Sequence, residues 1–445
     1  MKKKILIIPK KIITVNSQNA ILENYALEID NGTITKIESK EKFNLNNYDG
    51  NIFNYENYIL IPGFVQSHIH LCQTLFRGLA DDLELLDWLQ KKIFRFENAH
   101  NEKSIRTSAK LGIAELFSNG TTTILDMGTI NHQEIIFEEL IKSNIRAFAG
   151  KCMMNENQLY PQFKEDERSA IDRSISLAKE YHNYDRGRIK YAFAPRFVLS
   201  CSESLLRETY EIVKEMQGTL YHTHASENIS EIEIIKKQFK MGNIEYFGHI
   251  GVLSNRTMLA HCIHVSENEI ELLKNFQTRV LHCPSANLKL GSGIAPIPRY
   301  LNENISVSLG ADGAPCNNNL NVFTEMRLAS LIQKPIYGPT TMDALTTFKL
   351  ATIEGAKALH LGKEIGSIEV NKKADLVLLD LNKFDKPMSD ESLYSTIVYS
   401  TNKDSVKEVM VNGEWVVRNG TSTIFDENEL VKNGKNELKK LLGRI

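Results

Sequence analysis

The sequence lacks the features that mark several large classes of protein. No uncharged apolar run reaches the about 18 residues that a membrane-spanning helix needs. A formal net charge of only -2 over 445 residues gives no general attraction for nucleic acid or an anionic membrane. The six cysteines form no CxxC pair, and a chain of this length needs no disulfide framework. These absences predict a cytoplasmic protein whose partners are small molecules, with no nucleic acid and no membrane among them.

Eight short apolar runs bounded by turn residues predict buried strands. The first is YILIPGFVQSHIH, and the others cover residues 121–127, 146–153, 190–196, 220–225, 258–264, 279–284 and 307–312. Most intervals hold helix-like sequence, such as SIRTSAKLGIAELFSNG, where the apolar residues form one face and Gly120 ends the helix. Eight alternations of buried strand and helix predict an α/β fold, a closed parallel (β/α)8 or TIM barrel, over residues 59–364.

The two ends of the chain have a different pattern. Residues 1–58 contain two strand-like stretches around the turn DNG at Asp30 to Gly32, a strong hairpin signal. Residues 365–445 contain further strand-like stretches, with another turn at Asn412 and Gly413, and a charged helix over about 426–442. We expect the two ends to share a small β-sandwich domain, with the terminal helix closing the chain.

Five polar side chains fall at the ends of the predicted strands. His68 and His70 end the first strand and, two residues apart, share one face about 6.6 Å apart. His224 ends the fifth strand, His261 lies in the sixth and Asp312 ends the eighth. In a parallel barrel the carboxyl ends of all strands meet at one mouth, and burying five such groups there is costly unless an ion or a reaction uses them. Because imidazole and carboxylate bind zinc, the pattern predicts a catalytic metal site.

Glu227 follows His224 by three residues, where the chain turns from strand into helix. A carboxylate there can simply favour the helix N-terminus, but close to activated water it is placed to move a proton. We expect a supporting or core position for His222, His264 and His282. No chemical role is predicted for the remaining histidines: His100, His132, His182, His249 and His360.

Several motifs occur together and in a specific order. They are PGFVQSHIH, HASE, LAHC, HCPSANLKLGSGIAP and LGADGAPCNNN, followed by GSIEVNKKADLVLLDL near the end of the barrel. With these motifs the sequence resembles the amidohydrolase superfamily, specifically its mononuclear-zinc aminohydrolases, over nearly the whole chain. The resemblance implies a homodimer or higher homo-oligomer.

The resemblance also implies a role for each matching residue. The ligands of one Zn²⁺ would be His68, His70, His224 and Asp312, a set that also suits Fe²⁺. His261 would hold the attacking water or the substrate, and Glu227 would be the proton shuttle. Superfamily members with two metals use a modified lysine at a strand end. The fourth strand here ends with Arg196, and Lys151 near the end of the third strand is a more distant candidate, so one metal is expected.

Two groups of enzymes share the substrate-side motifs. HIHLCQ, FAGKCM and PRFVLSCSE resemble guanine deaminases, in which residues matching Gln73, Arg196 and Phe197 contact the base. LFRGLADDL, NLKLGSGIAP and DGAPCNNN resemble deaminases of methylthioadenosine, adenosylhomocysteine and 5'-deoxyadenosine, and also s-triazine hydrolases. Glu97 matches a carboxylate that binds ribose hydroxyls in the nucleoside enzymes. No arginine pair for an amino-acid carboxylate is recognised, which counts against adenosylhomocysteine.

The sequence therefore predicts a zinc-dependent aminohydrolase that releases ammonia from an amino-substituted purine, either a guanine-type base or a 5'-modified adenosine. The alternative is an s-triazine amino- or chlorohydrolase, although Glu227 favours deamination because related dechlorinases can lack the acidic shuttle. From a different class, a non-enzymatic metal- or ligand-binding protein on the same scaffold remains the rival hypothesis. Intact Glu227 and Asp312 count against it.

Overall fold

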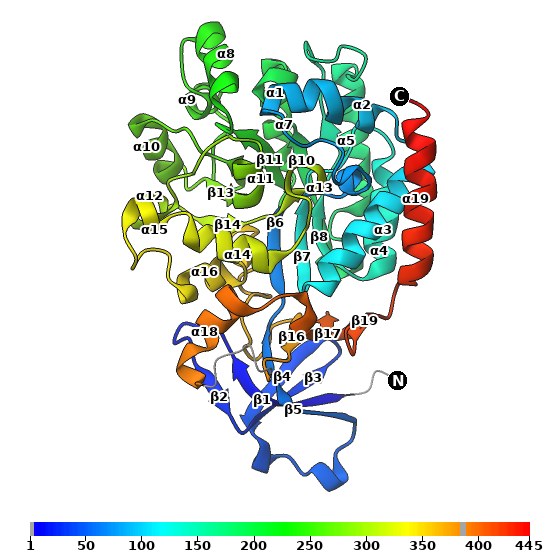
Figure 1. The fold of residues 1–445 in the computed structure, drawn as a ribbon, viewed down its shortest axis with the longest axis vertical. Coiled ribbons are helices and arrows are strands. Elements are labelled where there is room, and N and C mark those ends of the chain that lie inside the picture. Colours follow the sequence, from blue (N-terminus) through cyan, green and yellow to red (C-terminus); the bar gives the residue numbers. More distant parts are fainter. Residues whose placement is uncertain (1–3, 383–388) are drawn as a thin grey trace.

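A computed structural model describes residues 4–382 and 389–445, and it has a barrel above a smaller sheet domain (Figure 1). The barrel strands are β6 (Phe64–His70), β7 (Thr121–Asp126), β8 (Arg146–Ala149), β10 (Ile189–Pro195), β11 (Leu220–Ala225), β12 (Thr257–His261), β13 (Arg279–His282), β14 (Val307–Leu309) and β15 (Asp312–Gly313). All are parallel, in the order β14-β13-β12-β11-β10-β8-β7-β6-β15. Because β15 follows β14 closely and pairs with β6, Asp312 opposite Ile69, the ring closes. The predicted barrel is confirmed.

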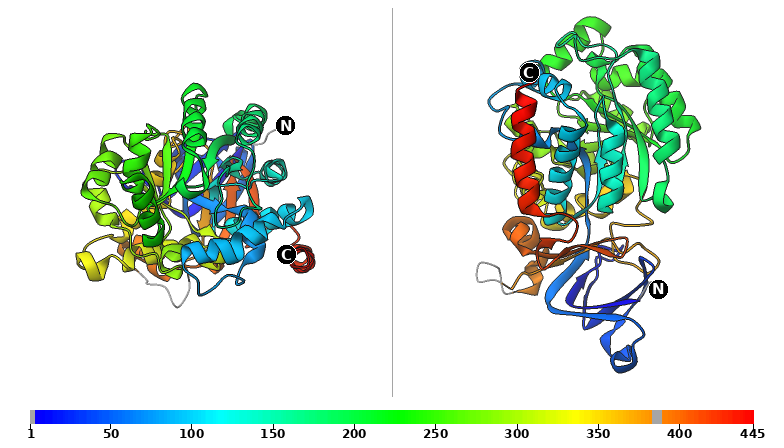
Figure 2. Two further views of the ribbon diagram at one scale, coloured as in Figure 1. Left: turned by 90° about the horizontal axis from the view of Figure 1, so that it is seen from above. Right: turned by 90° about the vertical axis from the view of Figure 1, so that its right-hand side faces the viewer.

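Helices surround the ring, as the views from above and from the side show (Figure 2). The longer ones are α3 (Glu102–Ser118), α4 (Gln133–Ser143), α5 (Glu167–Tyr181), α7 (Glu203–Glu215), α8 (Ile229–Phe239), α9 (Asn243–His249), α10 (Glu267–Asn275), α14 (Val322–Leu331), α16 (Ala344–Leu350) and α17 (Ile353–Ala358). In α3, Asn101 caps the first turn by accepting from the Ser104 backbone N–H, and Ser104 reciprocates. Among the described residues, no helix combines the length and apolarity required to cross a bilayer.

The small domain contains strands from both ends of the chain. They are β1 (Ile5–Ile13), β2 (Ile21–Glu23), β3 (Tyr25–Asp30), β4 (Thr33–Ser39), β5 (Asn51–Pro62), β16 (Leu376–Leu379), β17 (Val406–Val411), β18 (Glu414–Arg418) and β19 (Thr421–Ser422). Hydrogen bonds connect them into one nine-stranded sheet, in which β5 pairs with β16 and so joins the N-terminal strands to the C-terminal ones. The predicted sharing of one small β domain by the two ends is confirmed.

Both predicted turns form hairpins. Asn31 and Gly32 connect β3 to β4, Asn412 and Gly413 connect β17 to β18, and all four have φ between 51° and 82°, the left-handed region of a type I′ turn. The two turns also touch each other, because a Cβ on Gly32 would lie 2.3 Å from the carbonyl oxygen of Asn412. Glycine is therefore required at position 32 both by the backbone angle and by space.

The terminal helix α19 (Glu427–Leu442) runs along α3 on the outside of the barrel (Figures 1 and 2). Its Gly434 lies against Leu111 of α3, where a Cβ would be 3.0 Å from the leucine methyl group. Leu111 thus faces α19, while Ile105, Ile113 and Leu116 are fully buried on the barrel side of α3. The predicted apolar residues of α3 therefore pack on two sides, against the barrel and against α19.

A buried ion pair connects the barrel to the small domain. Arg146, the first residue of β8, donates to Asp375, just before β16, with Nε–Oδ2 and Nη2–Oδ1 distances of 2.7 and 3.0 Å. Asp375 Oδ1 also accepts from the Asn412 backbone N–H at 2.7 Å. Both charged side chains are at most 3% exposed, so each charge depends on the other to offset the free-energy cost of its removal from water.

We expect Asp375→Ala to lower the free energy of unfolding by about 3–5 kcal/mol, because it leaves the Arg146 guanidinium buried and unpaired. The measurement is urea unfolding followed by circular dichroism. Asp172→Ala is the matched control, since Asp172 pairs with Arg168 on an exposed helix surface and its loss should change stability little. Equal effects of the two substitutions would show that the buried pair does not stabilise the junction.

Candidate active site

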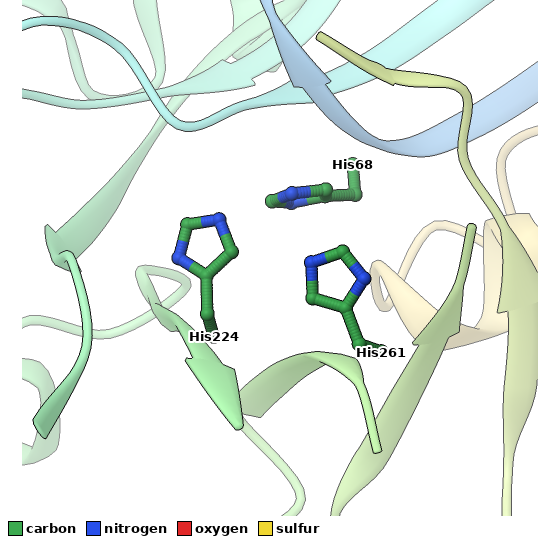
Figure 3. Close-up of side chains that lie close together, drawn as sticks. All are labelled: His68, His224 and His261. Carbon is green, nitrogen blue, oxygen red and sulfur yellow. The ribbon is translucent and has the colours of Figure 1, made fainter. Parts of the chain in front are cut away.

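A cavity opens at the carboxyl ends of the barrel strands. Its lining residues are His70, Gln73, Leu85, Trp88, Leu89, Arg196, Phe197, His224, Glu227, His261 and Asp312. His68 is fully buried beside it, and Glu97 contacts two of the lining side chains. The structure thus brings all the predicted site residues together. Figure 3 shows the rings of His68, His224 and His261 directed toward one common space from three strands.

Four side chains are spaced as ligands of a single ion would be. Asp312 Oδ1 lies 3.4 Å from His68 Nε2 and 3.3 Å from His70 Nε2, and His70 Nε2 lies 3.3 Å from His224 Nε2. Ligands about 2.0–2.1 Å from a tetrahedral zinc are about 3.3–3.4 Å apart. His68 Nε2 is also buried without a hydrogen-bond partner among the described residues. The donor set therefore fits a metal ion.

Neighbouring groups fix the orientation of the imidazoles. His224 Nδ1 lies 2.7 Å from the Arg196 carbonyl oxygen, and His261 Nδ1 lies 2.8 Å from Asn287 Oδ1. Because these oxygens only accept, each Nδ1 carries the hydrogen and each Nε2 presents its lone pair to the cavity. His68 Nδ1 is similarly 2.8 Å from His222 Nε2, a supporting position of the kind expected for His222.

The backbone turns sharply where these side chains leave their strands. His261, Asp312 and Ser226 have φ values of 75°, 62° and 52°, in the left-handed region that non-glycine residues seldom adopt. Such strain persists only where the surrounding structure enforces it, and it is common at functional sites. Here it turns the side chains of His261 and Asp312 into the mouth and starts the turn that leads to Glu227.

Burial gives the ionisable groups of the cavity different protonation states. It lowers the pKa of His261 to about 4, so the imidazole is neutral at pH 7. Burial alone would raise the pKa of Asp312, but its close contact with His68 and its interactions with His70 and His261 hold it well below its usual range. For Glu227, burial and then the charges of Asp312 and Glu231 raise the pKa well above its usual range. The surroundings thus favour the ionised form of Asp312 and the protonated form of Glu227, which suits the two carboxyls to opposite acid–base roles.

Glu227 is held close to His261. Its Oε2 lies 3.3 Å from His261 Nε2, and its backbone N–H donates to Glu231 Oε2 at 3.0 Å. Glu231 in turn accepts from Asn243 Nδ2 at 2.9 Å. This chain of contacts fixes the loop after β11, so Glu227 can reach a reacting atom above His261.

A buried polar cluster lies on the substrate side of the cavity. Arg196 Nη1 and Nη2 donate to Glu97 Oε2 and Oε1 at 2.6 and 3.2 Å, and Gln73 Nε2 donates to Oε1 at 2.7 Å. The Arg196 guanidinium also lies 5.1 Å above the ring of Phe94. Both oxygens of Glu97 are therefore engaged within the protein. Gln73 Oε1 is buried without a hydrogen-bond partner among the described residues.

Some cavity residues were not found from the sequence. Leu85 and Trp88 of α1 (Leu85–Trp88) and Leu89 of the following π-helical turn η4 (Leu89–Ile93) form an apolar wall. No periodic pattern distinguishes a helix that crosses the mouth from one that packs outside the barrel. Asn287 in α11 (Pro284–Lys289) was also missed, and its place directly after the seventh barrel strand was the available signal.

Lys151, the candidate for a bridging ligand, is engaged elsewhere. Its ammonium group is paired with Glu165 and donates to the Cys152 carbonyl oxygen at 3.2 Å. It is absent from the residues that line the cavity. Lys151 therefore adds no bridging ligand to the proposed ligand set.

A closed parallel barrel with these ligands and acid–base groups at its mouth is the arrangement of a metal-dependent hydrolase. The model of the amidohydrolase family matches residues 59–416. The 5'-deoxyadenosine deaminase of Methanococcus aeolicus is 35% identical over 96% of this chain and 98% of its own length. The 5-methylthioadenosine/S-adenosylhomocysteine deaminase of Acetivibrio thermocellus is also 35% identical, over 98% and 99%.

A solved structure shows the same architecture. The adenosine deaminase from Xanthomonas campestris, with bound zinc, superposes with a TM-score of 0.92 at 26% identity, covering 99% of this chain and 98% of that one. The chain therefore belongs to the amidohydrolase family.

Proposed function

We propose that this protein is a zinc-dependent deaminase that hydrolyses the exocyclic amine of a small purine and releases ammonia. The observation that carries the proposal is the placement of Glu227, with its raised pKa, 3.3 Å from His261 and beside the four-ligand set. The deaminase names of the two relatives support the reaction type.

In this proposal each side chain has one task. His68, His70, His224 and Asp312 would hold Zn²⁺, which as a Lewis acid makes water nucleophilic at neutral pH. Asp312 Oδ2, ionised and 3.8 Å from His261 Nε2, accepts the proton of the attacking water. The neutral His261 orients that water through Nε2. Glu227 donates its proton from Oε2 to the ring nitrogen next to the amine. Asp312 then passes the water proton to the amine, which leaves as ammonia, while the proton of the new hydroxyl group returns to Glu227 and a carbonyl remains on the ring.

The substrate is either a 5'-modified adenosine or a guanine-type base. The relatives act, by their names, on 5'-deoxyadenosine and methylthioadenosine, which supports a nucleoside. One observation favours the base: Arg196 and Gln73 occupy both oxygens of Glu97, so this carboxylate has less capacity to accept two ribose hydroxyls. Arg196 and Phe197 would then contact the base, and Gln73 Oε1 would accept from one of its N–H groups.

A coupled ammonia assay tests the proposal. The zinc-loaded protein is assayed with guanine, adenosine, 5'-deoxyadenosine, methylthioadenosine and an aminotriazine. We expect turnover of at least one purine. Activity confined to triazines would replace the purine proposal, and no turnover of any amine would support a binding protein instead.

The second arm of the test uses Arg196→Gln combined with Glu97→Gln, because the pair of changes leaves no uncompensated buried charge. If the substrate is a guanine-type base, we expect kcat/KM for guanine to fall about ten- to a hundredfold, the effect of losing a hydrogen bond from a charged donor. Turnover of adenosines alone in the wild-type protein would exclude the guanine-type base.

A further inference from the structure

Cys283 lies close to two of the proposed zinc ligands. A ring nitrogen of His68, a carboxylate oxygen of Asp312 and the Sγ of Cys283 are within 4.8 Å of one another, and all three residues are buried. Cys283 directly follows β13. Within the described part of the chain its Sγ donates only to the Leu281 carbonyl oxygen, at a long distance of 3.8 Å, so little holds the thiol hydrogen in place.

These three atoms differ in chemistry from the four-ligand set. Thiolate is a soft ligand that selects thiophilic cations, whereas imidazole and carboxylate accept harder ones. A cation bound between Cys283, His68 and Asp312 would use two ligands that the catalytic zinc also needs. The two positions therefore cannot both be filled with a complete ligand set.

We propose that Cys283, His68 and Asp312 form an alternative cation position that takes a thiophilic divalent cation such as Cd²⁺ and, when filled, excludes the catalytic metal. On binding, the cation forms a bond to Sγ, and the thiol proton passes to solvent. Cation binding is independent of the proposed deamination, whereas the resulting inhibition rests on that proposed function. The site would make the protein sensitive to thiophilic metals.

Cys316 provides a control thiol near the same aspartate. It is also buried, and its pKa, like that of Cys283, is raised first by burial and then by the charge of Asp312. Its Sγ instead donates to the Gly313 carbonyl oxygen at 3.1 Å, and it does not belong to the three-atom group. Cys283→Ser and Cys316→Ser thus each remove one buried thiol near Asp312, and only the first removes an atom of the three-atom group.

The test is titration of the metal-free, full-length protein with CdCl₂, following the ultraviolet charge-transfer band from sulfur to cadmium. We expect the band in the wild-type protein and in Cys316→Ser, and its loss in Cys283→Ser. Cadmium NMR of the wild-type protein should show the downfield shift of a thiolate ligand, a readout that needs no variant to fold. No band in the wild-type protein, a band that persists in Cys283→Ser, or a resonance typical of nitrogen and oxygen ligands alone would overturn the proposal.

The activity readout separates this proposal from the proposed function. In the zinc-loaded protein, Cd²⁺ should inhibit ammonia release by the wild type and by Cys316→Ser more strongly than by Cys283→Ser. Equal inhibition of all three would overturn the exclusion of the catalytic metal. If no deamination is found but the charge-transfer band depends on Cys283, the alternative cation position stands and only the proposed function fails.

Discussion

Glu227→Gln should lower kcat for ammonia release by about 10²–10⁴-fold while leaving the zinc content unchanged, as expected for the loss of a general acid. Glutamine keeps the size of the side chain but has no proton to transfer. Glu227 is buried, has a raised pKa and lies 3.3 Å from His261, so its surroundings favour the protonated carboxyl at the point where the ring nitrogen would receive a proton. Steady-state kinetics and metal analysis of the same preparation measure both quantities.

Glu231→Gln is the control for this prediction. Glu231 lies one helical turn further along, is equally buried and contacts the backbone of Glu227 instead of lining the cavity. Its burial raises its pKa to about 7, so substitution by neutral glutamine is a modest change. We expect a far smaller decrease in kcat. Full turnover by a zinc-containing Glu227→Gln protein would show that another group supplies the proton.

The barrel and the metal-type ligands could be predicted because both depend on local sequence. A parallel barrel strand is buried on both faces, by the helices outside the barrel and by the side chains inside it, so it appears in the sequence as a continuous apolar run. Each of the eight predicted runs coincides with a barrel strand. In a barrel the ends of such strands must meet, so the order of His68, His224 and Asp312 along the chain was enough to place them at one mouth.

The substrate side could not be predicted because it depends on contacts between distant segments. By its resemblance to guanine deaminases, Arg196 was expected to contact a base, yet Glu97, from a helix 99 residues earlier, engages both of its terminal nitrogens. The wall formed by Trp88 depends on how α1 crosses the mouth. The sequence pattern gives Cys283 no role, and only the ring closure brings it near His68 and Asp312.

Asp312→Asn should remove both bound zinc and turnover, because it is the one anionic group in the proposed ligand set. Two histidine nitrogens lie 3.3 and 3.4 Å from its Oδ1, so in the proposed site the carboxylate would both bind the ion and offset its charge. The loss of affinity should exceed the about 10–100-fold typical of changing a residue that only orients a ligand. Competition with a chelator of known affinity measures it, and dialysis against the chelator should abolish the activity of the wild-type protein as well.

Asp126→Asn is the matched control, because Asp126 ends β7, one strand away from His70, and is as deeply buried. It accepts from the Leu71 backbone N–H at 2.8 Å and does not line the cavity. Burial raises the pKa of Asp126 to about 7, so replacing it with neutral asparagine changes the charge at this position only a little. We expect this variant to keep its zinc. If instead Asp312→Asn retained stoichiometric zinc and full turnover while Asp126→Asn lost both, the ion would have to bind on the other side of β6, and the role given to the cluster of histidines would be wrong.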